Sequence, residues 1–214
     1  MRSVPISVEF DHLQIEREQR SLFPEPMSGR LPAGVLNILV GPNGSGKTSL
    51  LDLVALRART PLGTRLIWAG CTDATDIAYL PQQLWDVLDV RVGDLVELAF
   101  GRHRSRSTEV PGLLEEVMAR PKKELGTLSG GQRQLLLFWL VSSRPQGIYI
   151  YDEPLRHLDD RAARYVIETI ENQVKEGMFV AISEHSVVEH WTVPYQRLLV
   201  GAELATTRGQ NHVE

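Results

Sequence analysis

Hydrophobic and polar positions alternate near the N-terminus of the chain. Every second residue from Ile6 to Phe10 is hydrophobic, and the alternation resumes at Leu13 after two polar residues. A period of two is typical of strands with one buried face. We therefore expect this part of the chain to form β-strands.

Short and nearly continuous apolar runs occur farther along the chain. Val35–Val40, Gly147–Asp152 and Met178–Ser183 are dense enough in apolar residues to predict strands that are buried on both faces. Two shorter runs, Leu66–Trp68 and Ile77–Leu80, predict further strands, and a proline ends the second.

Helical spacing appears between the predicted strands. From Lys47 to Arg59 the apolar residues recur at intervals of three and four. From Val166 to Val174 they share one helical face, with Asp159–Asp160 placed to cap that helix and Gly177 placed to end it. Strands that alternate with helices predict a mostly parallel sheet covered on both sides.

The pattern changes between residues 84 and 128. Helix-like segments at Val92–Phe100 and Leu113–Met118 follow each other there, divided by a polar loop. We interpret residues 84–128 as a mainly helical subdomain inserted into a single domain that covers residues 1–214.

Composition and charge narrow the class of protein. The chain is 43% hydrophobic and 23% charged, as in soluble globular proteins, and its net charge is −4. That charge is too close to neutral for a typical nucleic-acid binder, so we expect no direct nucleic-acid partner. The apolar run Leu135–Val141 is about a third of the roughly 20 residues that a membrane span requires. We also expect no secretory signal, and the single Cys71 suits a reducing cytosol.

Residues 41–48 carry the first motif with a clear chemistry. They fit the pattern G-x-x-x-x-G-K-[ST], between a predicted buried strand and a predicted helix. Glycines let backbone N–H groups turn toward phosphate oxygens, and the positive end of the helix dipole favours the same anion. Lys47 is expected to reach the β- and γ-phosphates, and Thr48 to bind Mg²⁺. The predicted phosphate-binding residues are Gly41, Pro42, Asn43, Gly44, Ser45, Gly46, Lys47, Thr48 and Ser49.

Two adjacent carboxylates end the predicted buried strand at Ile148–Asp152. Burying Asp152 and Glu153 is costly unless a cation or a proton-accepting role compensates it. Their side chains are expected on opposite sides of an extended backbone, and therefore in different roles. Asp152 suits the shell of Mg²⁺, and Glu153 suits a general base that polarises the attacking water.

Leu128–Gln132 has the sequence LSGGQ, directly before the helical run Arg133–Ser143. Two glycines at a helix start expose N–H groups and predict a second anion site. With this motif the sequence resembles the ATP-binding cassette (ABC) ATPases, whose signature sequence is LSGGQ. The likeness covers residues 35–190, with the motifs in the family's order.

The resemblance implies an α/β fold of the P-loop NTPase type, with a mostly parallel sheet, an N-terminal antiparallel β part and an inserted helical subdomain. It also implies roles for single residues. Gln82 matches the Q-loop glutamine, which contacts Mg²⁺ and water, and Gln83 is the alternative. Leu158–Asp159 matches the end of the D-loop, and His185 matches the switch histidine that contacts the γ-phosphate.

In this family two cassettes pair head to tail, and the signature of one covers the ATP of the other. The resemblance therefore implies ATP and Mg²⁺ as cofactors, a homodimer, and nucleotide contacts from Ser129, Gly130, Gly131 and Gln132. It further implies a transmembrane permease partner, with the chain in the cytoplasm on the inner face of the membrane. The alternative is a soluble ABC ATPase, such as one in iron-sulfur assembly or one associated with nucleic acid or the ribosome.

Two positions depart from the family pattern. The family usually stacks an aromatic side chain on adenine, and the corresponding stretch here offers Phe23, with Arg17 or Arg20 as alternatives. The D-loop has Arg156–His157 where small residues are usual. The substrate and the direction of transport stay open at this stage.

Overall fold

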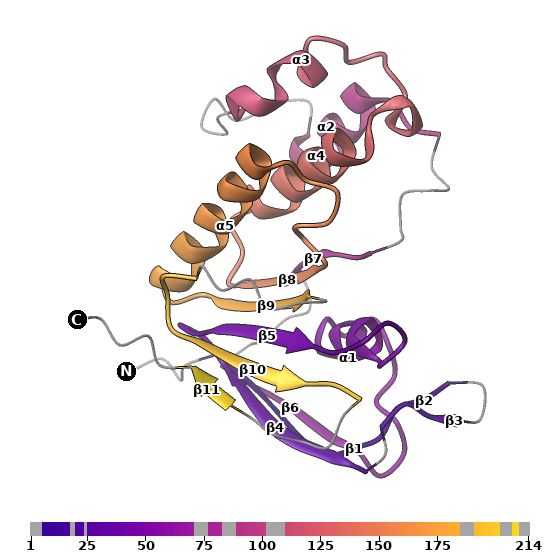
Figure 1. Ribbon diagram of the computed structural model, residues 1–214. Coiled ribbons are helices and arrows are strands. Elements are labelled where there is room, and N and C mark those ends of the chain that lie inside the picture. The colour runs from indigo at the N-terminus through magenta and orange to yellow at the C-terminus, as the bar shows by residue number, and fades with distance from the viewer. Residues whose placement is uncertain are drawn as a thin grey trace.

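A six-stranded sheet forms the middle of the computed structural model, which describes residues 6–17, 20–23, 25–70, 77–82, 89–101, 110–184, 191–201 and 207–209. The strand order is β11-β10-β5-β9-β8-β7 (Figure 1). All neighbours pair in parallel except β11, which is antiparallel to β10. The strands are β5 (Leu36–Val40), β7 (Ile77–Leu80), β8 (Ile148–Asp152), β9 (Phe179–Glu184), β10 (Tyr195–Leu199) and β11 (Thr207–Gly209).

A second, antiparallel sheet has the strand order β4-β1-β6. It consists of β1 (Ser7–Leu13), β4 (Met27–Pro32) and β6 (Arg65–Ala69), and a separate hairpin joins β2 (Glu16–Arg17) to β3 (Arg20–Ser21). The pairing of β1 with β4 shifts between Phe10 and Leu13, and His12 has a φ of 52°. The break in the hydrophobic alternation is therefore a bulge within one strand.

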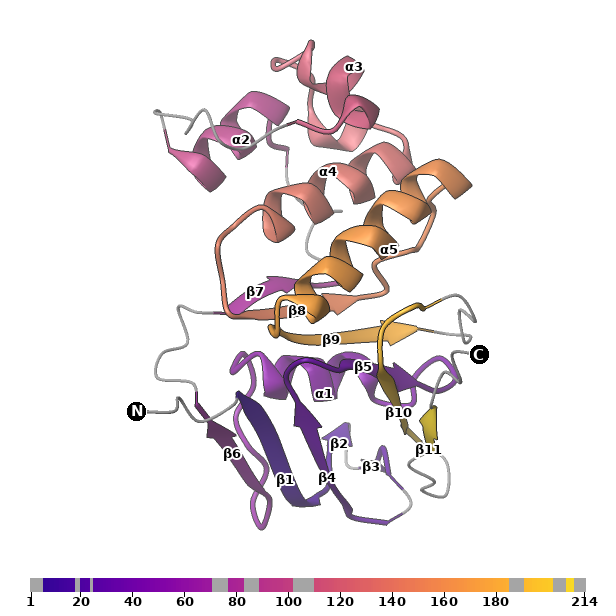
Figure 2. The same cartoon turned by 90° about the vertical axis from the view of Figure 1, so that its left-hand side faces the viewer.

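Helices cover both faces of the six-stranded sheet (Figures 1 and 2). On one face α1 (Lys47–Val54) lies between the two sheets, and on the other lie α4 (Gly130–Ser142) and α5 (Asp160–Lys175). The buried hydrophobic side chains accordingly form two clusters, one on each side of the sheet. The predicted mixed α/β class, with a parallel sheet and an antiparallel β part, is confirmed.

Helix α1 ends earlier than its apolar spacing indicated. The pattern predicted a helix to Arg59, but α1 stops at Val54 and Leu56 has a φ of 57°. A left-handed residue ends an α-helix, and the N–H groups of Arg57 and Ala58 then both bond to the carbonyl of Asp52. The predicted length was wrong because hydrophobic spacing carries no information about this turn.

The described residues between 89 and 128 are mainly helical. They form α2 (Val92–Phe100), α3 (Glu115–Met118) and the 3₁₀ helices Gly112–Leu114 and Leu125–Thr127. Figure 2 shows α2 and α3 beyond α4, on the side away from the sheet. Their apolar side chains join the same hydrophobic cluster as α4 and α5.

Helix α4 is buried around its whole circumference. Each residue from Leu135 to Leu140 is at most 5% exposed. The helix packs against β7, α5 and α2, which explains why its apolar run shows no polar face. No helix in the described part of the chain is long and apolar enough to cross a bilayer.

The N-terminus of α5 provides a test of this fold. Asp159 is the N-cap of α5, and its Oδ1 accepts a hydrogen bond of 2.8 Å from the N–H of Ala162. We expect Asp159→Ala to lower the free energy of unfolding by about 1 kcal/mol, and Asp159→Asn, which keeps the acceptor, to lower it much less. Urea denaturation measures both, and equal losses would contradict the cap.

Candidate nucleotide-binding site

The loop between β5 and α1 forms one wall of a cavity of about 360 Å³. Residues 43–49 line it together with Leu22, Gln82, Glu153 and Arg156. The structure therefore brings the phosphate-loop residues, the predicted Q-loop glutamine and the predicted general base into one site. Gly46 has a φ of 101°, a conformation that favours glycine, and directly precedes α1.

Lys47 points back onto the loop that precedes it. Its side chain is buried, and Nζ donates hydrogen bonds of 2.6 Å and 3.0 Å to the carbonyls of Gly41 and Pro42. Both acceptors are neutral, so no anion compensates the charge of Lys47 in these two contacts. The buried hydroxyl of Ser45 also has no hydrogen-bond partner among the described residues. The Lys47 cation and the Ser45 hydroxyl both fit a phosphate group.

Asp152 connects three elements at the end of β8. Thr48 Oγ1 donates a hydrogen bond of 2.7 Å to Asp152 Oδ2, and Ser183 Oγ, on the neighbouring strand β9, donates to Oδ1. Burial raises the pKa of Asp152, while the hydrogen bonds from Ser183 and Thr48 act in the opposite direction. A buried carboxylate of this kind is stabilised by a nearby cation.

The oxygen atoms of Thr48, Asp152 and Gln82 fit Mg²⁺, which prefers oxygen ligands and is usually held by one or two carboxylates plus substrate phosphates and water. No group of three or more His, Cys, Asp or Glu side chains within the described ranges is placed to hold a metal ion. A bound Mg²⁺ would therefore take its remaining ligands from phosphate and water.

Glu153 has an unusual backbone conformation. Its φ is 52°, and β8 has already ended at Asp152. The N–H of Glu153 donates to Ser183 Oγ at 3.0 Å, and its carbonyl accepts from the N–H of Arg156 at 3.1 Å and from Gln134 Nε2 at 3.3 Å. A positive φ costs about 1–3 kcal/mol for such a residue, and these three bonds hold it in place.

This turn corrects one expectation about the two carboxylates. An extended backbone would have placed Asp152 and Glu153 on opposite sides, but Glu153 leaves the extended conformation. Asp152 bonds to a residue of the cavity wall, and Glu153 lines the cavity itself. Both carboxylates therefore approach the same site and still differ in their contacts.

Glu184 is a third carboxyl group at this end of the sheet, and the sequence analysis missed it. Burial, and then the nearby carboxylates of Glu153 and Asp152, raise the pKa of Glu184 to about 8. Its Oε1 has no hydrogen-bond partner within the described ranges. In the sequence, Glu184 follows an apolar run and directly precedes His185. Its position at the end of a predicted strand was the one sequence signal for a functional role. His185 and the alternative Gln83 lie outside the described residues.

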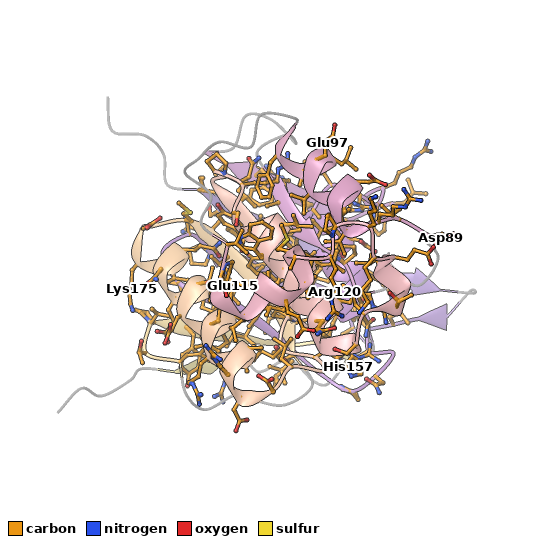
Figure 3. All side chains as sticks on the ribbon, turned by 90° about the horizontal axis from the view of Figure 1, so that it is seen from above. Asp89, Glu97, Glu115, Arg120, His157 and Lys175 are labelled. Atoms are coloured by element: carbon orange, nitrogen blue, oxygen red, sulfur yellow. The ribbon has the colours of Figure 1, made fainter. Side chains whose placement is uncertain are left out.

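The LSGGQ motif lies apart from this cavity in the same chain. Ser129 is the N-cap of α4 and shares a capping box with Gln132, whose N–H donates to Ser129 Oγ at 3.1 Å. The cavity wall includes none of residues 129–132. Instead the motif packs on the loop after Glu153: a Cβ on Gly131 would lie 2.7 Å from the carbonyl oxygen of His157. Figure 3 shows the exposed His157 side chain on this loop.

Phe23, the aromatic candidate for stacking on adenine, is a core residue. It is 1% exposed and packs under the phosphate loop, where a Cβ on Gly46 would lie 3.1 Å from its ring. Phe23 therefore supports the loop and presents no open face. The side chains of Arg17 and Arg20 lie outside the described part of the structure.

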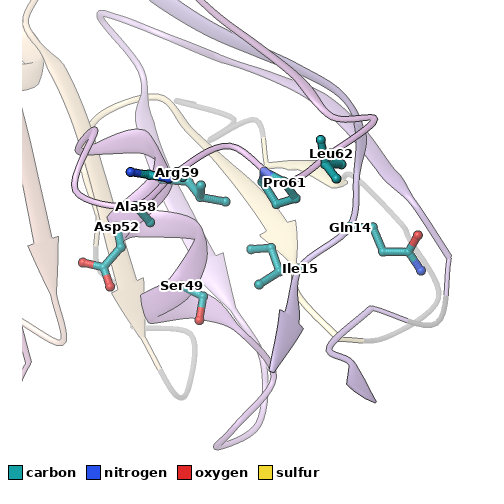
Figure 4. Close-up of a pocket in the computed structure, with 9 residues that line it drawn as sticks. Gln14, Ile15, Ser49, Asp52, Ala58, Arg59, Pro61 and Leu62 are labelled. Carbon is teal, nitrogen blue, oxygen red and sulfur yellow. The ribbon is translucent and has the colours of Figure 1, made fainter. Parts of the chain in front are cut away.

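A second cavity of about 590 Å³ adjoins the first (Figure 4). Gln14 and Ile15 form one wall, Ser49 and Asp52 of α1 form another, and residues 58–62 close it. Ser49 lines both cavities, which places the second cavity next to the phosphate loop.

The two glycines of the LSGGQ motif give a matched pair of variants. Gly131→Ala places a methyl group against a backbone carbonyl, and we expect it to lower the free energy of unfolding by about 1–3 kcal/mol. Gly130→Ala meets only the His157 side chain, at 3.6 Å, and should stay within about 1 kcal/mol of wild type. Urea denaturation compares them, and equal effects would contradict this packing.

Glu184 predicts a pH dependence of stability in the absence of nucleotide and divalent cations. The native chain holds this proton up to about pH 8, whereas the ordinary pKa of the group is 4.5. The free energy of unfolding should therefore fall as the pH rises between these values, by about 1.4 kcal/mol per pH unit. Glu184→Gln should remove this slope in urea denaturation at several pH values, and an unchanged slope would contradict the assignment.

Comparison with known proteins agrees with this geometry. The model of the family "ABC transporter" matches residues 24–156. A "Probable metal transport system ATP-binding protein" of Chlamydia muridarum is 28% identical over 172 residues, which are 73% of this chain and 66% of the relative. A "Cytochrome c biogenesis ATP-binding export protein CcmA" of Cupriavidus pinatubonensis is 28% identical over 166 residues, 72% of this chain and 73% of the relative. The chain thus spans about two thirds of the first relative's length.

Solved structures confirm the fold. The "Structure of ATP binding subunit of ABC transporter" superimposes with a TM-score of 0.74 at 20% identity, covering 94% of this chain and 89% of that one. The family model matches more than half of the chain, and residues 43–49, Gln82 and Glu153 line one cavity. The chain therefore belongs to the ABC transporter family and carries its ATP-binding ATPase domain.

Proposed function

We propose that this chain binds and hydrolyses ATP to power transport through a separate transmembrane permease, as a head-to-tail dimer on the cytoplasmic face of the membrane. One observation carries the proposal. A single cavity collects the phosphate loop with Lys47, the Thr48–Asp152 pair and the Glu153 carboxylate. Phosphate binding, Mg²⁺ binding and water activation need these three groups.

Lys47 and the loop N–H groups would hold the triphosphate. Lys47 Nζ now bonds to two loop carbonyls, and phosphate oxygens would replace them with charged acceptors. The N-terminus of α1 adds its positive dipole at the same place. The nucleoside would extend past Ser49 toward the second cavity (Figure 4), where Ile15 and Leu62 offer apolar surface.

Glu153 would act as the general base. Its carboxylate lines the phosphate cavity, and three backbone hydrogen bonds fix the residue that carries it. A positioned base of this kind contributes about 10²–10⁴-fold to the rate. Mg²⁺, held by Thr48, Asp152 and Gln82, supplies charge neutralisation on the phosphates when bound. Contact of His185 with the γ-phosphate stays a prediction.

The separation of the signature from the cavity supports the dimer. Residues 129–132 start a helix outside the phosphate cavity of their own chain, although a helix start is suited to anions. In a head-to-tail pair they would cover the triphosphate of the partner copy. Each site would then need both chains, so ATP would hold the dimer together and hydrolysis would release it.

The membrane partner is supported by the relatives. One is named for a metal transport system and another for export in cytochrome c biogenesis, and both are named as ATP-binding proteins. This chain would supply the ATPase of a transport system of that general kind. Co-purification with a membrane protein separates this function from that of a soluble ABC ATPase.

Two variants test the proposed function. Glu153→Gln keeps the shape but removes the base, so ATP affinity should hold while turnover falls at least about 100-fold. The same variant should form a dimer on gel filtration only when ATP is present. Lys47→Ala should weaken ATP binding about 10- to 100-fold in calorimetry, since it removes a charged phosphate contact. A Glu153→Gln chain that stays monomeric with ATP, or unchanged ATP affinity in Lys47→Ala, would contradict the proposal.

A further inference from the structure

Arg156 is a second cation in the wall of the phosphate cavity. It lies three residues after Glu153, on the loop that follows β8. Its Nη1 is 3.4 Å from Glu153 Oε2. The guanidinium group therefore faces the same space as Lys47 and contacts the side chain that is expected to activate water.

The two side chains of the ion pair between Arg156 and Glu153 differ in their exposure to solvent. The Glu153 side chain is 5% exposed, whereas the Arg156 side chain is 47% exposed. Water can therefore solvate the guanidinium group when it leaves its partner. The buried Glu153 carboxylate then needs another compensation for its charge, such as a cation or a proton. A terminal phosphate offers more negative charge than one carboxylate and accepts the two parallel N–H groups of a guanidinium.

The turn after Glu153 does not need this side-chain pair. The backbone N–H of Arg156 already bonds to the carbonyl of Glu153, and Gln134 Nε2 bonds to the carbonyls of Glu153 and Pro154. The backbone thus places Arg156 at the cavity, while its Nη1 lies 3.4 Å from the Glu153 carboxylate.

Lys47 and Arg156 make the same kind of contact. Each cation of the cavity wall contacts oxygen atoms of the chain itself, Lys47 through two carbonyls and Arg156 through the Glu153 carboxylate. For Lys47, the two carbonyl oxygens accept the hydrogen bonds that phosphate oxygens would accept when ATP is bound. The same reasoning applies to Arg156, because it lines the same cavity.

We propose that Arg156 is a catalytic residue that binds the terminal phosphate of ATP in its own chain and thereby releases the Glu153 carboxylate for the attacking water. The inference rests on the proposed ATP hydrolysis. In that step the water oxygen bonds to the terminal phosphorus and a water proton passes to Glu153. The bond to the bridging oxygen breaks, and its electron pair leaves with ADP.

The test compares the affinity for two nucleotides that differ by the terminal phosphate. For Arg156→Ala we expect affinity for a non-hydrolysable ATP analogue to fall about tenfold or more, since a charged phosphate contact is lost. Affinity for ADP should stay within about twofold, because ADP lacks the group that Arg156 binds. Turnover at saturating ATP and Mg²⁺ should fall about 10²–10³-fold, as for loss of one transition-state donor.

Arg120→Ala is the matched control. Arg120 is an exposed arginine after α3 that pairs with Glu116 at 3.3 Å (Figure 3). In Figure 1, α3 lies beyond α4 on one side of the six-stranded sheet and α1 lies on the other side, so this variant should change neither affinity nor turnover. Arg156→Lys, which keeps the charge but not the planar fork, should retain part of the analogue affinity.

Each other outcome overturns the inference. Unchanged turnover and analogue affinity in Arg156→Ala would show that the arginine does not contribute to binding or catalysis. Faster turnover would show that the ion pair only restrains the Glu153 side chain. Equal losses of analogue and ADP affinity would indicate a structural role. A wild-type chain that binds neither nucleotide would overturn the proposed function itself, whereas a wild type that hydrolyses ATP confines the failure to Arg156.

Discussion

The hydrogen bonds around Asp152 are the interaction on which the site depends. Asp152 accepts from Thr48 at the start of α1 and from Ser183 at the end of β9, and Ser183 also accepts from the N–H of Glu153. These bonds connect the start of α1, the Asp152 carboxylate and the proposed general base Glu153 to neighbouring parallel strands. Because parallel strands end at the same edge of a sheet, residues distant in sequence meet there without a long loop.

Much of the fold was readable from hydrophobic patterning. The apolar runs at 35–40, 147–152 and 178–183 are parallel central strands, and Asp159 caps the helix that its position predicted. The phosphate loop and the acidic pair were readable because their chemistry requires fixed residue types at fixed spacing. The family assignment followed from their order along the chain, and the family match confirms it.

The unpredicted parts depend on backbone turns and on burial. The left-handed Leu56 ends α1, and the left-handed Glu153 brings a second carboxylate to the cavity. Neither residue is a glycine, so the residue type gives no indication of a left-handed conformation at either position. The raised pKa of Glu184 results from packing between strands that are far apart in sequence. Arg156 stood out only as a departure from the family pattern, and its place in the cavity wall required the structure.

Gln134 gives the signature helix a direct attachment to the catalytic loop. It lies in the second turn of α4, and its Nε2 bonds to the carbonyls on both sides of the Glu153–Pro154 peptide bond. In the proposed dimer, the start of α4 covers the nucleotide of one site while Gln134 holds the base of the other. A displacement of α4 by one nucleotide would thus act on the backbone of the residue whose carboxylate lies beside the second nucleotide, and this contact would couple the two sites of the proposed dimer.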